Sequence, residues 1–165
     1  MSGYKIIRYH SGLDSDEIVS FISKIQHQEF DIELNENDIY PLRNIDTYFY
    51  CPLTNQVNFW VAVSNENKII GTVGLKYLNK KEYEVKRFFV DGDYRGKGVS
   101  ADLMTCVIEH AQNSTIYLGT ATNKARAIGF YLKKGFVEID QSLLPEDYAI
   151  DPLDNRFFKL DTANV

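Results

Sequence analysis

The feature that most restricts the fold is a change of hydrophobic period near residue 95. Before it, three extended runs at residues 57–63, 68–77 and 82–90 are separated by short polar turns. After it, apolar residues recur at helical spacing from about Gly96 to Gln112. The sequence therefore predicts an antiparallel meander followed by a long amphipathic helix.

The flanking segments extend this arrangement. The pattern predicts a helix that Asp14 or Ser15 can cap, and a second helix from about Asn123 to Lys134, which Gly135 ends. The remaining predicted strands are residues 4–9, 115–119, 136–140 and 156–160. Residues 29–56 show no sustained period and are expected to form a loop with a short helical piece. The order indicates an α+β or α/β fold, with a mixed, mostly antiparallel central sheet of about seven strands flanked by helices.

Length and composition favour one globular domain over residues 1–165. The chain is 44% hydrophobic and 25% charged, and it has no run of the roughly 20 apolar residues that a membrane helix needs. Its N-terminus lacks the apolar run of a signal peptide, so a cytoplasmic protein is expected. The formal net charge of −5 argues against nucleic-acid binding. We expect neither a nucleic acid nor a membrane as partner.

The cysteines and histidines do not predict a metal site. Cys51 and Cys106 lie far apart, and the three histidines are scattered singly along the chain. Neither spacing is typical of metal ligands or of a disulfide framework. We expect no metal.

The segment from Arg95 to Ser100 has the composition of an anion site. It reads Arg-Gly-Lys-Gly-Val-Ser at the start of the predicted helix, where first-turn amides lack intrahelical partners. Gly96 and Gly98 would let a phosphate approach those amides, but such a glycine pair also occurs in a purely structural turn. A nucleotide-hydrolase loop fits poorly, because Lys97 is followed by Gly98 instead of Ser or Thr.

Three segments together resemble the GCN5-related N-acetyltransferase (GNAT) superfamily. They are the strand Glu84–Val90, the turn Arg95–Ser100, and residues 127–136, in which Tyr131 precedes Gly135-Phe136. The turn is similar to the family's Gln/Arg-x-x-Gly-x-Gly/Ala pattern, with Ser100 in place of the last small residue. The resemblance covers about residues 57–140 and implies the acyl-CoA N-acyltransferase fold.

The resemblance implies an acetyl-CoA site. Phe88, Phe89 and Val90 would lie beside the pantetheine arm, and Tyr131 would protonate the departing CoA thiolate. The residues that would hold the diphosphate are Arg95, Gly96, Lys97, Gly98, Val99 and Ser100. Aromatic packing is the alternative role of Tyr131.

Two further positions carry alternatives. Glu84 lies where several family members have a catalytic glutamate, which would take the proton of the acceptor amine, but it could equally be a solvated strand residue. Many members have an asparagine seven residues before the tyrosine, and that position here is Lys124. Asn123, one residue earlier, would either contact the cofactor in place of that asparagine or cap the second helix.

The resemblance implies an N-acetyltransferase that moves acetyl from acetyl-CoA to a primary amine by direct attack in a ternary complex. The partner would be an amine-bearing small molecule or peptide, and a homodimer is possible. The acceptor is expected against residues 30–50, whose carboxylates and aromatic side chains would suit an amine with an apolar body: Asp38, Tyr40, Asp46, Tyr48, Phe49 and Tyr50. Asp46 would bind the ammonium; packing in the core is the alternative role of the aromatic residues. The alternatives are a non-catalytic acyl-CoA-binding sensor or interaction module, and an enzyme that uses Cys51 or Cys106 as acyl carrier.

Overall fold

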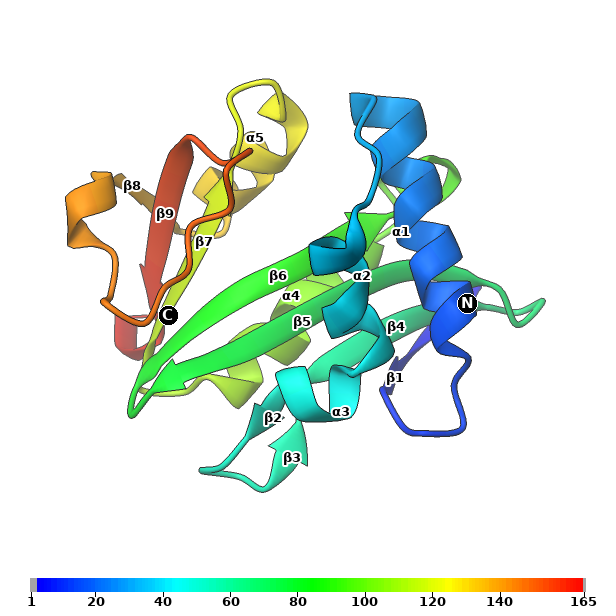
Figure 1. The fold of residues 1–165 in the computed structure, drawn as a ribbon, viewed down its shortest axis with the longest axis horizontal. Helices are drawn as coiled ribbons and strands as arrows, with labels where there is room; N and C mark the ends of the chain where they lie inside the picture. Colours follow the sequence, from blue (N-terminus) through cyan, green and yellow to red (C-terminus); the bar gives the residue numbers. More distant parts are fainter. Residues whose placement is uncertain (1–2, 165) are drawn as a thin grey trace. The chain divides into compact units, whose positions relative to one another are not determined.

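The computed structural model describes residues 3–164, and the chain divides into two compact units. Unit 1 holds the chain up to Lys76 together with Lys86–Val107, and unit 2 holds Tyr77–Val85 and the chain from Ile108 onward. Seven strands are ordered β1-β4-β5-β6-β7-β9-β8 (Figure 1). This mixed, mostly antiparallel sheet confirms the predicted fold class; one domain over residues 1–165 stays a prediction.

Unit 1 contains the predicted meander. β1 (Tyr4–Arg8) pairs antiparallel with β4 (Phe59–Ser64), which pairs antiparallel with β5 (Ile69–Asn79). The strand β6 (Glu82–Val90) follows β5 and contributes its last residues to this unit. A separate two-stranded hairpin joins β2 (Tyr50–Cys51) to β3 (Gln56–Val57).

Helices cover both faces of the unit 1 strands (Figure 1). α1 (Ser15–Phe30) is capped by Asp14, whose side chain accepts a hydrogen bond from the Asp16 amide, as predicted. α2 (Glu36–Arg43) and α3 (Ile45–Tyr48) follow it on the same face, and α4 (Val99–His110) lies on the other. The core between α1–α3 and the strands is formed by buried apolar side chains: Ile18, Val19, Ile22, Leu42, Ile45, Phe49, Phe59, Val61 and Val63.

The segment 29–56 is more regular than the sequence predicted. Asn35 and Asp38 form a capping box in which each side chain accepts a hydrogen bond from the other residue's amide. This pair starts α2, which is then too short and too interrupted by Pro41 to show a hydrophobic period. The predicted short helical piece is confirmed by α2; the second helix, α3, and the small hairpin of β2 and β3 were not predicted.

Unit 2 contains the remaining strands and the last helix. β7 (Thr115–Thr120) pairs antiparallel with β9 (Arg156–Asp161), which pairs antiparallel with β8 (Val137–Ile139). β6 joins β7 in parallel from Glu82 to Glu84. α5 (Ala125–Lys133) ends before Gly135, whose φ of +99° confirms the predicted helix stop. Short 3-10 turns occupy Gly92–Tyr94, Gln141–Leu143 and Thr162–Asn164.

Helix length bears on membrane insertion. Over residues 3–164, no helix combines the length and the apolar character that crossing a bilayer would require.

We predict that Gly74→Ala destabilises the fold. A Cβ at Gly74 would lie 2.4 Å from Cε1 of the fully buried Phe49 ring, so the ring must move within a packed core. Overpacking of this kind costs about 1–3 kcal/mol of unfolding free energy, which urea denaturation would measure.

Gly129→Ala is the matched control. A Cβ at Gly129 meets nothing within 4 Å in α5, so helix propensity should keep or raise stability by up to about 1 kcal/mol. Equal stability of Gly74→Ala and wild type would contradict the predicted clash.

Candidate functional site

The turn before α4 presents a row of backbone amides. Gly96 and Gly98 have φ of +74° and +94°, a region that residues with a Cβ rarely adopt. The helical ladder begins only where the Asp102 amide donates to the Gly98 carbonyl at 3.0 Å. Among residues 3–164, no backbone amide from Gly96 to Ala101 has an acceptor. These amides lie at the positive end of α4, so the turn is suited to an anion.

The side chains of the turn contribute less charge than the sequence suggested. Arg95 Nη2 donates to both carboxylate oxygens of Glu29, at 2.6 and 2.7 Å. The Lys97 ammonium lies 5.3 Å from the centre of the Tyr94 ring, and the side chain of Ser100 is half-buried. The attraction of an anion to this turn would therefore come mainly from the backbone amides, because the charge of Arg95 is largely balanced by Glu29.

Tyr4 supports the turn from β1, and sequence reasoning did not identify it. Its hydroxyl donates to Asp102 Oδ2 at 2.5 Å, in the first turn of α4. The same hydroxyl would lie 3.2 Å from a Cβ added at Gly98. The hydrogen bond to Asp102, followed by burial, raises the pKa of Tyr4 to about 12. No sequence signal links these residues, because 98 positions separate them.

The strand before the turn is irregular. Arg87, inside β6, has a φ of +57°, as residues in a β-bulge can have. Its guanidinium donates to the Asp38 carbonyl at 2.8 Å, and its own carbonyl accepts from Thr72 Oγ1 at 2.7 Å. After this point Phe88 and Phe89 are half-buried and Val90 is buried. Their contact with pantetheine stays a prediction.

Glu84 is buried in unit 2. It lies opposite Tyr117 in the parallel β6–β7 register, and only 4% of its surface is exposed. The alternative of a solvated strand residue was therefore wrong. Alternation along a strand indicates one exposed face only where nothing covers it, and the buried Tyr148 lies beside this carboxylate.

Tyr131 is also buried, with 7% of its surface exposed. Its ring centre lies 5.7 Å from that of Phe136 and 6.3 Å from that of Phe158. Burial raises the pKa of Tyr131 well above the ordinary value for a phenol, and the charge of Asp154 adds to the shift. The hydroxyl therefore keeps its proton at neutral pH. Packing and proton donation are compatible roles for this residue.

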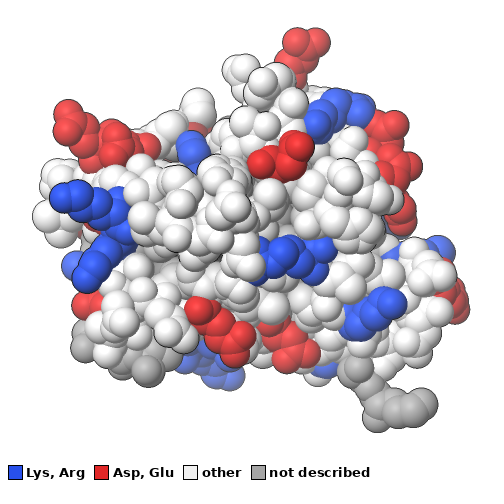
Figure 2. Space-filling model, turned by 90° about the horizontal axis from the view of Figure 1, so that it is seen from below, with Lys and Arg blue, Asp and Glu red and all other residues white. Residues whose placement is uncertain are grey.

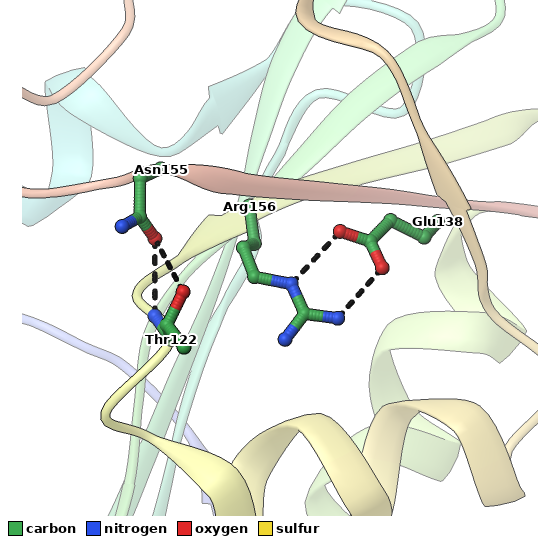
Figure 3. Close-up of polar contacts among 4 residues, drawn as sticks. All are labelled: Thr122, Glu138, Asn155 and Arg156. Carbon is green, nitrogen blue, oxygen red and sulfur yellow. Dashed lines mark hydrogen bonds and ion pairs between the residues drawn. The ribbon is translucent and has the colours of Figure 1, made fainter.

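The loop that leads into α5 is tied to the start of β9. Asn155 Oδ1 accepts from the Thr122 amide at 3.0 Å and from the Thr122 hydroxyl at 3.3 Å (Figure 3). Arg156 beside it makes two hydrogen bonds to Glu138, at 2.7 and 2.8 Å (Figure 3). The N-cap of α5 is Lys124, without a side-chain cap. The expected capping by Asn123 was wrong, because the helix begins one residue later than that role requires; its contact with the cofactor stays a prediction.

The segment expected to bind the acceptor is largely committed to other contacts. Phe49 is fully buried in the core, and the Asp38 carboxylate belongs to the capping box. The ammonium groups of Lys76 and Lys86 lie 4.7 and 6.0 Å from the centre of the Tyr48 ring. A further cation at this ring would be repelled by both.

The cysteines differ in access. Cys51 is fully buried in β2 and Cys106 is half-buried in α4; neither forms a disulfide within the described part of the chain. Burial of Cys51 disfavours it as an acyl carrier.

Charge on the surface is mixed. On the face drawn in Figure 2, Lys and Arg side chains alternate with Asp and Glu in small groups. Within residues 3–164, no three His, Cys, Asp or Glu side chains are grouped so that they could hold a metal ion.

Comparisons with known proteins agree on one family. Residues 19–136 match the family model described as Acetyltransferase (GNAT) family. An acetyltransferase of the GNAT family from Staphylococcus aureus Mu50 superposes with a TM-score of 0.83 at 33% identity, covering 96% of this chain and 99% of that one. An acetyltransferase from Streptococcus agalactiae 2603 has the same fold, with a TM-score of 0.84 at 23% identity, covering 96% and 98%.

Curated relatives share part of their length with this chain. Human N-acetyltransferase 8B is 34% identical over 51% of the chain, and N-acetylaspartate synthetase from Danio rerio is 30% identical over 72%. The chain spans 40% and 43% of the lengths of these two proteins.

We predict a pH-dependent contribution of Tyr4 to stability. Its folded-state pKa of about 12 lies above the ordinary 10.0, so the contribution is complete below pH 10 and is lost as the pH rises through about 12. Wild type should exceed Tyr4→Phe in unfolding free energy at about pH 9, and the difference should shrink at about pH 11.5. Urea denaturation at several pH values measures this; a difference that stays constant with pH would contradict it.

Proposed function

This chain belongs to the acetyltransferase (GNAT) family, and we propose that it transfers the acetyl group of acetyl-CoA to a primary amine. The acceptor would be a small molecule or a peptide, and it would attack directly in a ternary complex. The observation that carries the proposal is the row of amides from Gly96 to Ala101 at the start of α4.

The turn fits a diphosphate. Its amides are turned outward by two glycines at positive φ, and Gly96, Lys97 and Gly98 are exposed. A Cβ at Gly96 would meet nothing within 4 Å, so the protein leaves that side of the turn open. Main-chain amides at a helix N-terminus bind phosphate oxygens without a counter-ion of their own.

Two buried side chains of unit 2 would handle protons. Acetyl-CoA supplies the acetyl group as a thioester. Glu84, which is buried, would take a proton from the acceptor ammonium. Tyr131 would donate its proton to the leaving sulfur; its raised pKa keeps it protonated beforehand.

The names of relatives suggest which amines to test. One relative is an N-acetylaspartate synthetase, whose name states an acetylated amino acid as its product. Amino acids, L-aspartate included, therefore belong in an acceptor panel beside simple amines and short peptides. A non-catalytic acyl-CoA sensor is the alternative function, and the same acceptor panel distinguishes a sensor from an enzyme.

We predict that Gly98→Ala weakens acetyl-CoA binding. A Cβ at φ +94° strains the turn, and Tyr4 Oη blocks its relaxation from 3.2 Å. A strain of about 1–2 kcal/mol corresponds to a rise in Kd of about tenfold. Isothermal titration calorimetry measures this, with Gly129→Ala as the control that should match wild type; unchanged affinity of Gly98→Ala would remove the turn from the site.

We predict that Tyr131→Phe lowers kcat by about 100-fold or more, because the leaving sulfur loses its proton donor. The Kd for acetyl-CoA should stay near the wild-type value, since the ring and its contacts with Phe136 and Phe158 are kept. The measurement is CoA release over the amine panel. Tight acetyl-CoA binding with no turnover of any amine by wild type would favour the sensor.

A further inference from the structure

One ion pair joins the end of α1 to the turn that precedes α4. Arg95 Nη2 donates to Glu29 Oε1 at 2.6 Å and to Glu29 Oε2 at 2.7 Å, although 66 positions separate the two residues. Both residues belong to unit 1, and their side chains are 27% and 29% exposed. Solvent therefore screens this pair less than it would screen a fully exposed one.

The charge of Glu29 does not stabilise its own helix. Glu29 lies in the last turn of α1, one residue before the end at Phe30. The negative end of the helix dipole disfavours a carboxylate there, and glutamine has a similar helix propensity without the charge. The charge of Glu29 therefore acts on Arg95 and not on α1.

The geometry of the pair leaves part of the Arg95 guanidinium unused. One nitrogen, Nη2, serves both carboxylate oxygens, and among residues 3–164 neither Nε nor Nη1 of Arg95 has an acceptor. Arg156 instead binds Glu138 through two nitrogens, Nε at 2.8 Å and Nη2 at 2.7 Å (Figure 3). The two-nitrogen fork is the more favourable geometry for a carboxylate. Arg95 is therefore the arginine of these two that can exchange its partner more readily.

Arg95 adjoins the row of amides that would hold the diphosphate. Its own amide donates to the Gly92 carbonyl at 3.4 Å, and the next residue, Gly96, has the φ of +74° that turns the chain. Arg95 Nη1 would lie 3.5 Å from a Cβ added at Gly92, so the guanidinium lies beside this turn. An arginine side chain is long and flexible, and its guanidinium can change partner without a change in the backbone.

We propose that Glu29 limits the affinity of the turn for acetyl-CoA, because its carboxylate competes with the diphosphate for Arg95. The inference rests on the proposed acetyl transfer, since the amide row alone would not identify a ligand and membership in the acetyltransferase family points to acetyl-CoA. On binding, the N–H groups of Nη2 pass from Glu29 to phosphate oxygens, and Glu29 is released to water. Glu29 does not touch the cofactor; it is a positioning residue that acts through Arg95.

A bound diphosphate can displace this carboxylate. It carries more negative charge than one carboxylate, and arginine binds phosphate oxygens through charge-assisted hydrogen bonds. The amides of Gly96 and Gly98 would hold the phosphate next to Arg95 while the exchange takes place. The exchange costs the ion pair, so the affinity is lower than the amides and Arg95 would give without Glu29. Since differences in affinity appear mostly in the dissociation rate, Glu29 would speed the release of CoA.

The test is the binding of acetyl-CoA, without amine, to Glu29→Gln and to Arg95→Gln. Glutamine keeps the length of Glu29 and one hydrogen-bond acceptor, but it removes the charge. Glu29→Gln should lower the Kd about two- to fivefold, the value of a partly exposed ion pair. Arg95→Gln should raise the Kd about tenfold, because a charge-assisted bond to phosphate is lost. Isothermal titration calorimetry measures both, and the two effects are expected to have opposite signs.

The double variant shows whether Glu29 acts through Arg95. Once Arg95 is replaced, Glu29 has no competition to exert, so adding Glu29→Gln to Arg95→Gln should lower the Kd by less than about twofold. An equal gain with and without Arg95 would overturn the competition, because the Glu29 charge would then repel the cofactor directly.

Glu138→Gln is the matched control. It removes the same charge from the pair with Arg156, and neither residue is among those expected to hold the cofactor. Its Kd for acetyl-CoA should match wild type. Dephospho-CoA keeps the diphosphate and lacks the 3′-phosphate, so Glu29→Gln should bind it with the same gain as CoA. A gain that is lost with dephospho-CoA would overturn the exchange at the diphosphate.

The signs of the two single variants separate competition from a structural role. Weaker binding by both Glu29→Gln and Arg95→Gln would overturn the competition, since the pair would then only hold the turn in place. An unchanged Kd in Glu29→Gln would overturn it as well. Either result leaves the acetyltransferase proposal intact, provided that wild type acetylates an amine. Absence of acetyl-CoA binding by wild type would overturn both proposals.

Discussion

The exposed backbone amides at the start of α4 depend on one constraint, the positive φ of Gly96 and Gly98. A helix that started in the ordinary way would have its first amides capped by a side chain, as Asp14 caps α1 and Asn35 caps α2. The two glycines instead delay the helical ladder until Asp102 and leave the preceding amides directed outward. The unsatisfied amides cost stability, and the tight packing of Val99 and Leu103 against Gly71 of β5 offsets that cost.

In unit 2 the candidate site residues are buried side chains, whereas in unit 1 the candidate anion site is formed by the backbone of the turn before α4. Glu84, Tyr131 and Tyr148 are each less than a tenth exposed. Burial raises the pKa of both phenols, so each is a neutral hydrogen-bond donor at physiological pH. The two tyrosines differ in setting: Tyr131 lies on a helix among phenylalanines, whereas Tyr148 lies on a loop beside Glu84. The two tyrosines therefore have different neighbours, aromatic rings at Tyr131 and a carboxylate at Tyr148.

Patterns in the local sequence predicted the features of the fold that interactions between neighbouring residues determine. The order of strands and helices followed from hydrophobic period, and the stop at Gly135 followed from its tolerance of positive φ. The partners of the site did not follow, because they come from distant positions: Tyr4 reaches Asp102, and Glu29 reaches Arg95. The cap at Asn123 failed for a related reason, since the hydrogen bonds of Asn155 fix the loop before α5. Sequence period carries no information about such pairs.

The two aromatic sites also explain why a count of aromatic residues does not locate a cationic substrate. The residues 30–50 are rich in tyrosine and carboxylates, yet the ring of Tyr48 already has two lysine ammonium groups nearby. Tyr148 stands in a stretch with few aromatic neighbours in sequence, and the fold surrounds it with carboxylates. An ammonium gains about 1 kcal/mol from an aromatic face at an exposed site, and a charge within a few ångströms acts with equal or larger energy. The charges around a tyrosine ring, which only the fold determines, therefore affect its attraction for a cation more than the number of aromatic residues nearby in sequence does.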